Sequence, residues 1–99
     1  MGTRAIITFT DDNDKYHVYQ HWDGDPETVK ANIQSALKLA WPLPRFEPDE
    51  FAAAYIAANK TSEGNIRVSN VGPEKYGDLS YSYVVTCEGS KLHVKTSRG

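Results

Sequence analysis

Apolar residues stand at positions 5, 7 and 9 and at positions 16 and 18 of two early segments of the chain, residues 3–10 and 15–22. Both segments are rich in β-branched and aromatic residues, and the four residues between them are aspartates and an asparagine. Two such runs on either side of a cluster of turn formers indicate a β-hairpin. Pairing Thr10 with Lys15 places the apolar side chains of both strands in one row, which predicts a core-facing side.

The middle of the chain changes to helical spacing. Asp25 and Pro26 form a strong helix start, an N-cap acid followed by proline at the first helical position. Apolar residues then recur every three or four positions, and the prolines that follow end this helix near Trp41. A second helix start lies at Glu47 and Pro48, ahead of an alanine-rich stretch.

The last third returns to strand patterns. Residues 66–69 predict a short strand, and residues 79–88 and 91–96 predict two stronger ones. Gly89 and Ser90 separate the stronger pair with the composition that a type II′ turn prefers. The apolar side chains of that second hairpin then share one face.

The resulting element order is ββααβββ. With 99 residues, the chain fits one domain. We therefore expect a single α+β domain over residues 1–99, an antiparallel sheet with two helices packed on one face. The order of the strands stays open at this point.

The second face of the first hairpin is the most suggestive surface. It carries the following side chains: Arg4, Ile6, His17, Tyr19 and His21. If both helices cover the other face, this mixture of aromatic, histidine, arginine and aliphatic groups points outward, as is typical of a binding surface. In the alternative interpretation, the loop over residues 71–78 or a second copy of the chain covers it.

Composition and charge argue against several classes of function. A net charge of −2 without a basic stripe gives no footprint for nucleic acid, and Lys91, His93 and Lys95 fit a solvated edge strand. No apolar run approaches the roughly 20 residues of a membrane span. The lone cysteine, Cys87, forms no internal disulfide. Together with the lack of a signal sequence, it leads us to expect a cytoplasmic protein.

No constellation of residues specifies catalysis or a metal. His17 and His21 are four positions apart on a strand, roughly 13 Å, which is too far to share one ion. His21 and Asp23 could supply two ligands, but the sequence offers no third. Cys87 has Leu92 opposite it in the predicted register, so we interpret it as a buried core thiol. We predict no catalytic residue, metal or cofactor.

Two motifs carry a resemblance. The sequence GTRA at residues 2–5, and a tyrosine-rich strand followed by His-Trp-Asp-Gly-x-Pro-Glu up to residue 27, resemble small uncharacterised proteins of phages, prophages and their bacterial hosts. Asp25 stands where those proteins usually have an aromatic residue. The resemblance implies an accessory protein of a mobile element. Such proteins often bind and block a host component, including CRISPR-type defence machinery.

The same corner also has a structural interpretation. Trp22 would cap the core, Asp23 would accept backbone N–H bonds, and Gly24 would supply a positive φ on the way into the helix. Weighing both, we predict a non-catalytic protein that binds, and inhibits, a host protein. The alternatives are a nucleotide- or small-ligand-binding protein or minor enzyme using the first hairpin, and a phage assembly protein. The predicted binding residues are Arg4, His17, Tyr19, His21, Trp22 and Asp23.

Overall fold

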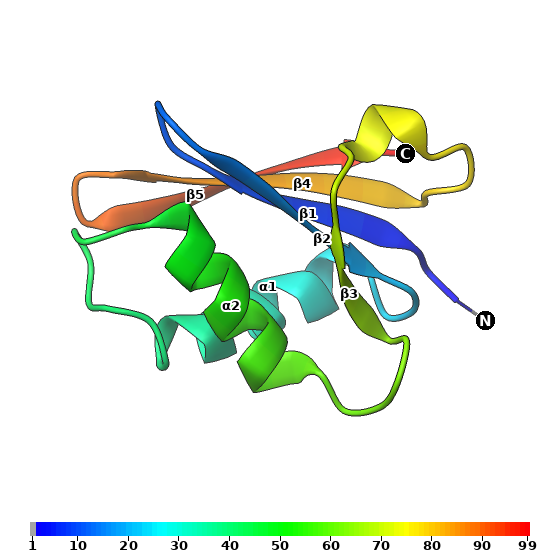
Figure 1. Ribbon diagram of the computed structural model, residues 1–99, viewed down its shortest axis with the longest axis horizontal. Coiled ribbons are helices and arrows are strands. Elements are labelled where there is room, and N and C mark those ends of the chain that lie inside the picture. Colours follow the sequence, from blue (N-terminus) through cyan, green and yellow to red (C-terminus); the bar gives the residue numbers. More distant parts are fainter. Residues whose placement is uncertain (1) are drawn as a thin grey trace.

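The β-branched segments of the chain form one five-stranded sheet, and both helices pack on the same face of it (Figure 1). A computed structural model describes residues 2–99. The strands are β1 (Ala5–Thr10), β2 (Lys15–Gln20), β3 (Ile66–Ser69), β4 (Tyr81–Glu88) and β5 (Lys91–Arg98). The helices are α1 (Pro26–Leu37), α2 (Pro48–Asn59) and the short 3-10 helix η1 (Pro73–Lys75). The predicted α+β class and its ββααβββ order are confirmed.

Both predicted hairpin registers are confirmed. In the first hairpin Thr10 pairs with Lys15. In the second, Cys87 pairs with Leu92 across the turn. Gly89 has a φ of 62°, the positive value that a type II′ turn requires at its first central residue. Turn chemistry and alternation of side chains together therefore set the register of these strands.

The sheet is mixed, whereas the sequence led us to expect antiparallel strands throughout. The strand order is β3-β2-β1-β4-β5, and β1 runs parallel to β4. The long connection from β3 through η1 returns the chain to the far side of β1, so that β4 enters beside β1 in the same direction (Figure 1). As the central strand, β1 is buried on both faces from Ala5 to Phe9.

The helix starts follow the sequence closely. Asp25 caps α1 by accepting a hydrogen bond from the backbone N–H of Thr28 at 3.2 Å, and α2 begins at Pro48. The end of α1 differs from the prediction, because the helix stops at Leu37 instead of near Trp41. Past that point the chain turns, and the backbone N–H groups of Leu39 and Ala40 both donate to the Ala36 carbonyl at 3.0 Å.

The main core lies between the sheet and the two helices. Phe9 of β1 packs against Phe51 and Tyr55 of α2, with ring centroids 5.5 and 5.6 Å apart. Val29 and Ile33 of α1 are also buried in this layer. The alanines of α2 let its backbone approach the sheet, as the sequence suggested.

The opposite face of the sheet is covered, so the expected open patch is wrong for its central residues. Ile6 is fully buried and Tyr19 is only 6% exposed. Leu79 and Tyr76, from the segment around η1, pack on them as a second, smaller cluster. The loop alternative is therefore the one that the structure supports.

Candidate functional site

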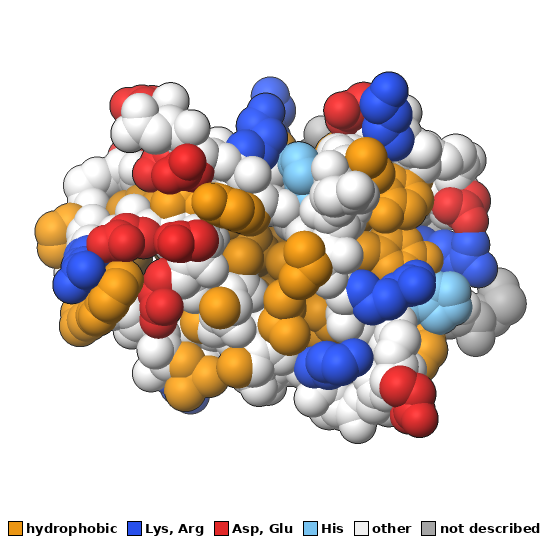
Figure 2. Space-filling model, viewed as in Figure 1, with side chains coloured by type: hydrophobic (Ala, Val, Ile, Leu, Met, Phe, Trp, Pro, Cys, Tyr) orange, Lys and Arg blue, Asp and Glu red, His pale blue; other side chains and the backbone are white. Residues whose placement is uncertain are grey.

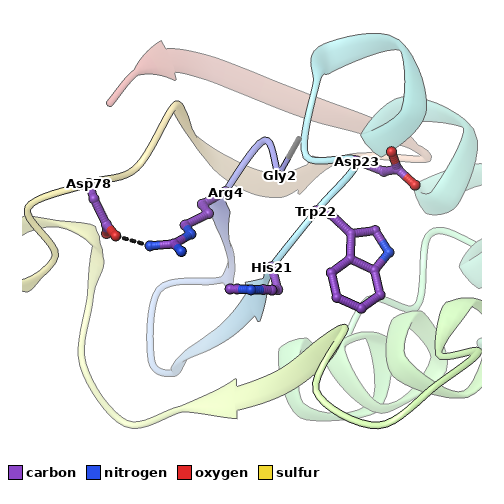
Figure 3. A pocket seen from close by; sticks show the side chains of 6 residues that line it. All are labelled: Gly2, Arg4, His21, Trp22, Asp23 and Asp78. Carbon is purple, nitrogen blue, oxygen red and sulfur yellow. Dashed lines mark hydrogen bonds and ion pairs between the residues drawn. The ribbon is translucent and has the colours of Figure 1, made fainter.

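Four of the six predicted binding residues surround one hollow at the edge of the molecule. The hollow has a volume of about 600 Å³ and lies where β1 begins and β2 ends (Figure 3). We call it the Trp22 hollow, and its lining residues are Gly2, Arg4, His21, Trp22, Asp23 and Asp78. Segments from the beginning, the first hairpin and the late loop of the chain therefore meet at one place.

An ion pair forms one wall of the Trp22 hollow. The guanidinium of Arg4 donates to the carboxylate of Asp78 across the opening (Figure 3). The side chains are 40% and 57% exposed. An exposed pair of this kind contributes little to folding stability. Both groups are thus accessible to a partner that offers better hydrogen bonds.

An aromatic row lies behind the hollow and fixes His21. The Tyr19 hydroxyl lies 2.9 Å from Nδ1 of His21. On its other side Tyr19 stacks on Tyr76 with ring centroids 5.5 Å apart, and the Arg67 guanidinium lies 4.7 Å from its ring centre. Tyr19 therefore helps to hold the ring of His21 and offers almost no surface of its own.

Trp22 is the exposed apolar element of the hollow. Its side chain is 37% exposed and meets the His21 ring edge-on at 5.5 Å. The buried amide of Gln20 donates from Nε2 to the backbone carbonyls of Trp22 and Asp23, at 3.1 and 2.8 Å. The turn is thus held by hydrogen bonds to its backbone. The indole lines the hollow, and its capping of the core stays a prediction.

The roles of Asp23 and Gly24 differ from the prediction. Asp23 has the positive φ, 60°, and the carboxylate of Asp23 points away from Arg4 (Figure 3). Gly24 is needed for space: a Cβ on it would lie 2.7 Å from both the Ala5 Cβ and the Thr3 carbonyl oxygen. The turn therefore packs directly on the start of β1, so that Trp22 and Arg4 line the same hollow.

His17 does not join the other predicted residues. Its Nδ1 lies 2.8 Å from the Thr8 hydroxyl oxygen, on the face near η1. Partial burial lowers the pKa of His17; Glu74 raises the pKa by a smaller amount, and Lys15 lowers it slightly. His17 thus belongs to the packing around η1 and not to the hollow.

Asp78 is the charged lining residue that the sequence did not predict. It lies 74 positions after Arg4, in a loop without a strand or helix pattern. The surplus of polar residues in that loop is typical of any surface turn. The only usable signal was Arg4 itself, a charged residue directly before a strand.

Metal and nucleophile chemistry receive no support from the described residues. Within residues 2–99, no three histidine, cysteine or acidic side chains gather as a metal site would require. Cys87 is half-buried and its thiol donates to the Gly89 carbonyl at 3.3 Å, so the prediction of a buried core thiol is wrong. Lys91, His93 and Lys95 are exposed on β5, which is an edge strand as predicted.

Comparison with protein-family models, with curated proteins and with solved structures finds no match to this chain. Among residues 2–99, the helices are too short and too polar to cross a bilayer.

Proposed function

We propose that this protein is a non-catalytic binding protein that engages a partner protein through the Trp22 hollow. The observation that carries the proposal is the grouping of Arg4, His21 and Trp22 around one shallow, accessible depression. Tryptophan and arginine are the residue types that most often dominate binding energy at protein interfaces. Here both are exposed while their backbone is held rigidly, which lowers the entropy lost on association.

The chemistry of the hollow favours a partner segment with both an apolar and a charged group. Trp22 supplies a ring for apolar or cationic contacts. Arg4 and Asp78 supply one charge of each sign, so a partner carboxylate or guanidinium can replace one member of the pair. A cluster of side chains on a partner protein can offer both an apolar group and a charged group.

The resemblance of the first 27 residues to phage and prophage proteins supplies the proposed context. In it, the partner is a host protein, such as a component of CRISPR-type defence, and binding inhibits it inside the host cytoplasm. This context is an analogy from related sequence motifs and names no particular partner.

The test is affinity capture of tagged protein from lysate of the host bacterium, with mass spectrometry. The chain provides matched controls. Trp41 is 38% exposed beneath the Arg45 guanidinium, and Arg45 forms its own exposed ion pair with Glu47. The informative pairs of variants are Trp22→Ala against Trp41→Ala, and Arg4→Ala against Arg45→Ala.

We expect one stoichiometric protein that Trp22→Ala and Arg4→Ala each lose, while both control variants retain it. Losing a central interface tryptophan weakens binding by about 2 kcal/mol or more, which is roughly thirtyfold. Beads without a specific protein, or equal loss in the control variants, would reject the proposal. Urea unfolding of each variant separates loss of binding from loss of fold.

A small ligand is the second candidate, and the size of the hollow favours it. About 600 Å³ lies within the usual range for ligand sites, roughly 300–1,000 Å³. Arg4 and His21 would then bind an anionic group while Trp22 stacks on a ring, as in nucleotide binding. Thermal-shift measurement with ATP and GTP tests this: a rise in Tm that Trp22→Ala abolishes would favour it, and unchanged Tm values would exclude it.

A further inference from the structure

A second surface, separate from the Trp22 hollow, lies where α2 runs beside the open edge of the sheet. A groove of about 530 Å³ occupies it. We call it the α2–β3 groove, and its lining residues are Lys15, Tyr16, His17, Val18, Asp49, Ala52, Ala53, Ile56, Val68, Ser69 and Asn70. The two sites share no lining residue.

Large apolar side chains are exposed at this groove. Val68 of the edge strand β3 is 77% exposed, and Tyr16 at the start of β2 is 43% exposed. An edge strand with an exposed valine invites pairing, which proteins usually prevent with charge or cover. Figure 2, which looks onto this face, shows hydrophobic side chains in its middle. Exposed apolar side chains of this kind are typical of a surface that another protein covers.

One side of α2, on which Ile56 is partly buried and Asp49, Ala53 and Lys60 are exposed, has a symmetric pattern about its own midpoint. Asp49 and Lys60 lie at the two ends, with Ala53 and Ile56 between them, and both pairs are centred between residues 54 and 55. These four positions fall on one side of a helix because they are spaced by four, three and four residues. Lys60 is the C-cap directly after the last helical residue, Asn59, and its Nζ donates to the carbonyls of Ser62 and Ile66 at 3.1 and 3.2 Å.

A two-fold axis through that midpoint makes the pattern self-complementary. Two antiparallel α2 helices would place Asp49 of each copy beside Lys60 of the other. The small Ala53 of each copy would leave space that the larger Ile56 of the other copy fills. Acidic side chains gather at one end of this face in Figure 2, and Lys and Arg side chains lie toward the other. A two-fold rotation brings unlike charges together at both ends.

We infer that the α2–β3 groove is a homodimer interface, in which a second copy of this chain packs its α2 antiparallel to that of the first. The contact is isologous, as in most soluble dimers. In it, Val68 and Tyr16 become covered by the other copy. The Trp22 hollow stays outside the contact, so each dimer presents two partner-binding sites.

Sedimentation velocity of the purified protein over a range of concentrations tests the inference. We expect a dimer that dissociates on dilution, and a monomer at every concentration for Val68→Asp. Because Val68 is 77% exposed, aspartate there leaves the fold intact, as urea unfolding can verify. Trp22→Ala serves as the control and should dimerise like the wild type.

Charge reversal tests the geometry itself. Asp49→Lys alone sets lysine against Lys60 at both ends, and Lys60→Glu alone sets glutamate against Asp49. Each variant should dimerise at least about tenfold more weakly than the wild type. An equimolar mixture of the two restores both ion pairs, so it should form a heterodimer near wild-type strength.

Three results would overturn the inference: a monomeric wild type at all concentrations, a Val68→Asp variant that still dimerises, or a charge-reversed mixture no tighter than its components. None of them touches the proposed function, because capture of a partner through the Trp22 hollow needs only one copy. Conversely, failure to capture a partner leaves the sedimentation result unchanged.

Discussion

The phenolic oxygen of Tyr83, on β4, donates a 2.6 Å hydrogen bond to the backbone carbonyl of Gly24. This bond joins two points 59 residues apart and ties the late strand to the turn that presents Trp22. Burial, reinforced by the nearby Asp25 charge, raises the pKa of Tyr83. The hydroxyl therefore stays protonated and continues to donate over the whole range in which the protein is handled.

Tyr83→Phe should lower the free energy of unfolding by about 1–3 kcal/mol, since it leaves the Gly24 carbonyl without its buried donor. Urea unfolding measures this as a lower midpoint with an unchanged m-value. Tyr16→Phe is the control, because Tyr16 is 43% exposed. Equal midpoints for the two variants would contradict the structural role of Tyr83.

Gly24→Ala should destabilise the fold through crowding. The new methyl group would lie 2.7 Å from the Ala5 Cβ and from the Thr3 carbonyl oxygen. Overpacking of this kind costs about 1–3 kcal/mol. Gly77→Ala is the matched control, since its Cβ meets nothing within 4 Å. A Gly24→Ala midpoint as high as that of Gly77→Ala would show that the turn has room to shift.

Asp25→Ala should lower the free energy of unfolding by about 1 kcal/mol, the usual effect of losing an N-cap. Partial burial would raise the pKa of Asp25, but hydrogen bonds from the side chain and backbone of Thr28 outweigh it and lower the pKa. The carboxylate thus stabilises the fold above its unfolded pKa and loses that effect in acid. Asp25→Asn keeps a capping oxygen and should lose less than alanine at neutral pH in urea unfolding.

His17 should make stability depend on pH near neutrality. Because partial burial lowers its pKa in the folded protein, the unfolded chain binds the proton more readily. The contribution of His17 is therefore complete above the unfolded pKa of about 6.5 and falls as the pH drops below it. Urea unfolding of wild type and His17→Gln from pH 7.5 to 5 measures the difference. Parallel curves would show that His17 does not titrate differently on folding.

Local signals in the sequence were enough for the hairpins and helix starts. Turn residues and alternation set the pairing of Thr10 with Lys15, and the Asp25 cap fixed the beginning of α1. The parallel pairing of β1 with β4 was missed, although Ile6 gave a signal: it makes β1 apolar on both faces, as in a strand with neighbours and cover on each side.

The candidate site was predicted only in part, because only part of it is built from local structure. Arg4, His21, Trp22 and Asp23 belong to one hairpin and its turn, so their proximity follows from local structure. Asp78 comes from an irregular loop, and Tyr19 is covered by Tyr76 from that loop. The sequence of such a loop has no periodic pattern that predicts where it folds back. The position of this loop decides which residues of the outer face remain accessible.

The parallel pairing between β1 and β4 has a consequence for the order of folding. Residues 5–9 pair with residues 81–85. We call this pairing the central seam of the sheet, and it joins the paired strands that lie farthest apart in the sequence. Each hairpin can form early from neighbouring residues, but the two can join only after most of the chain exists. Folding should therefore be limited by closure of this seam, as in proteins of high contact order. During synthesis, β1 has an unpaired edge until residues 81–85 have been added to the chain.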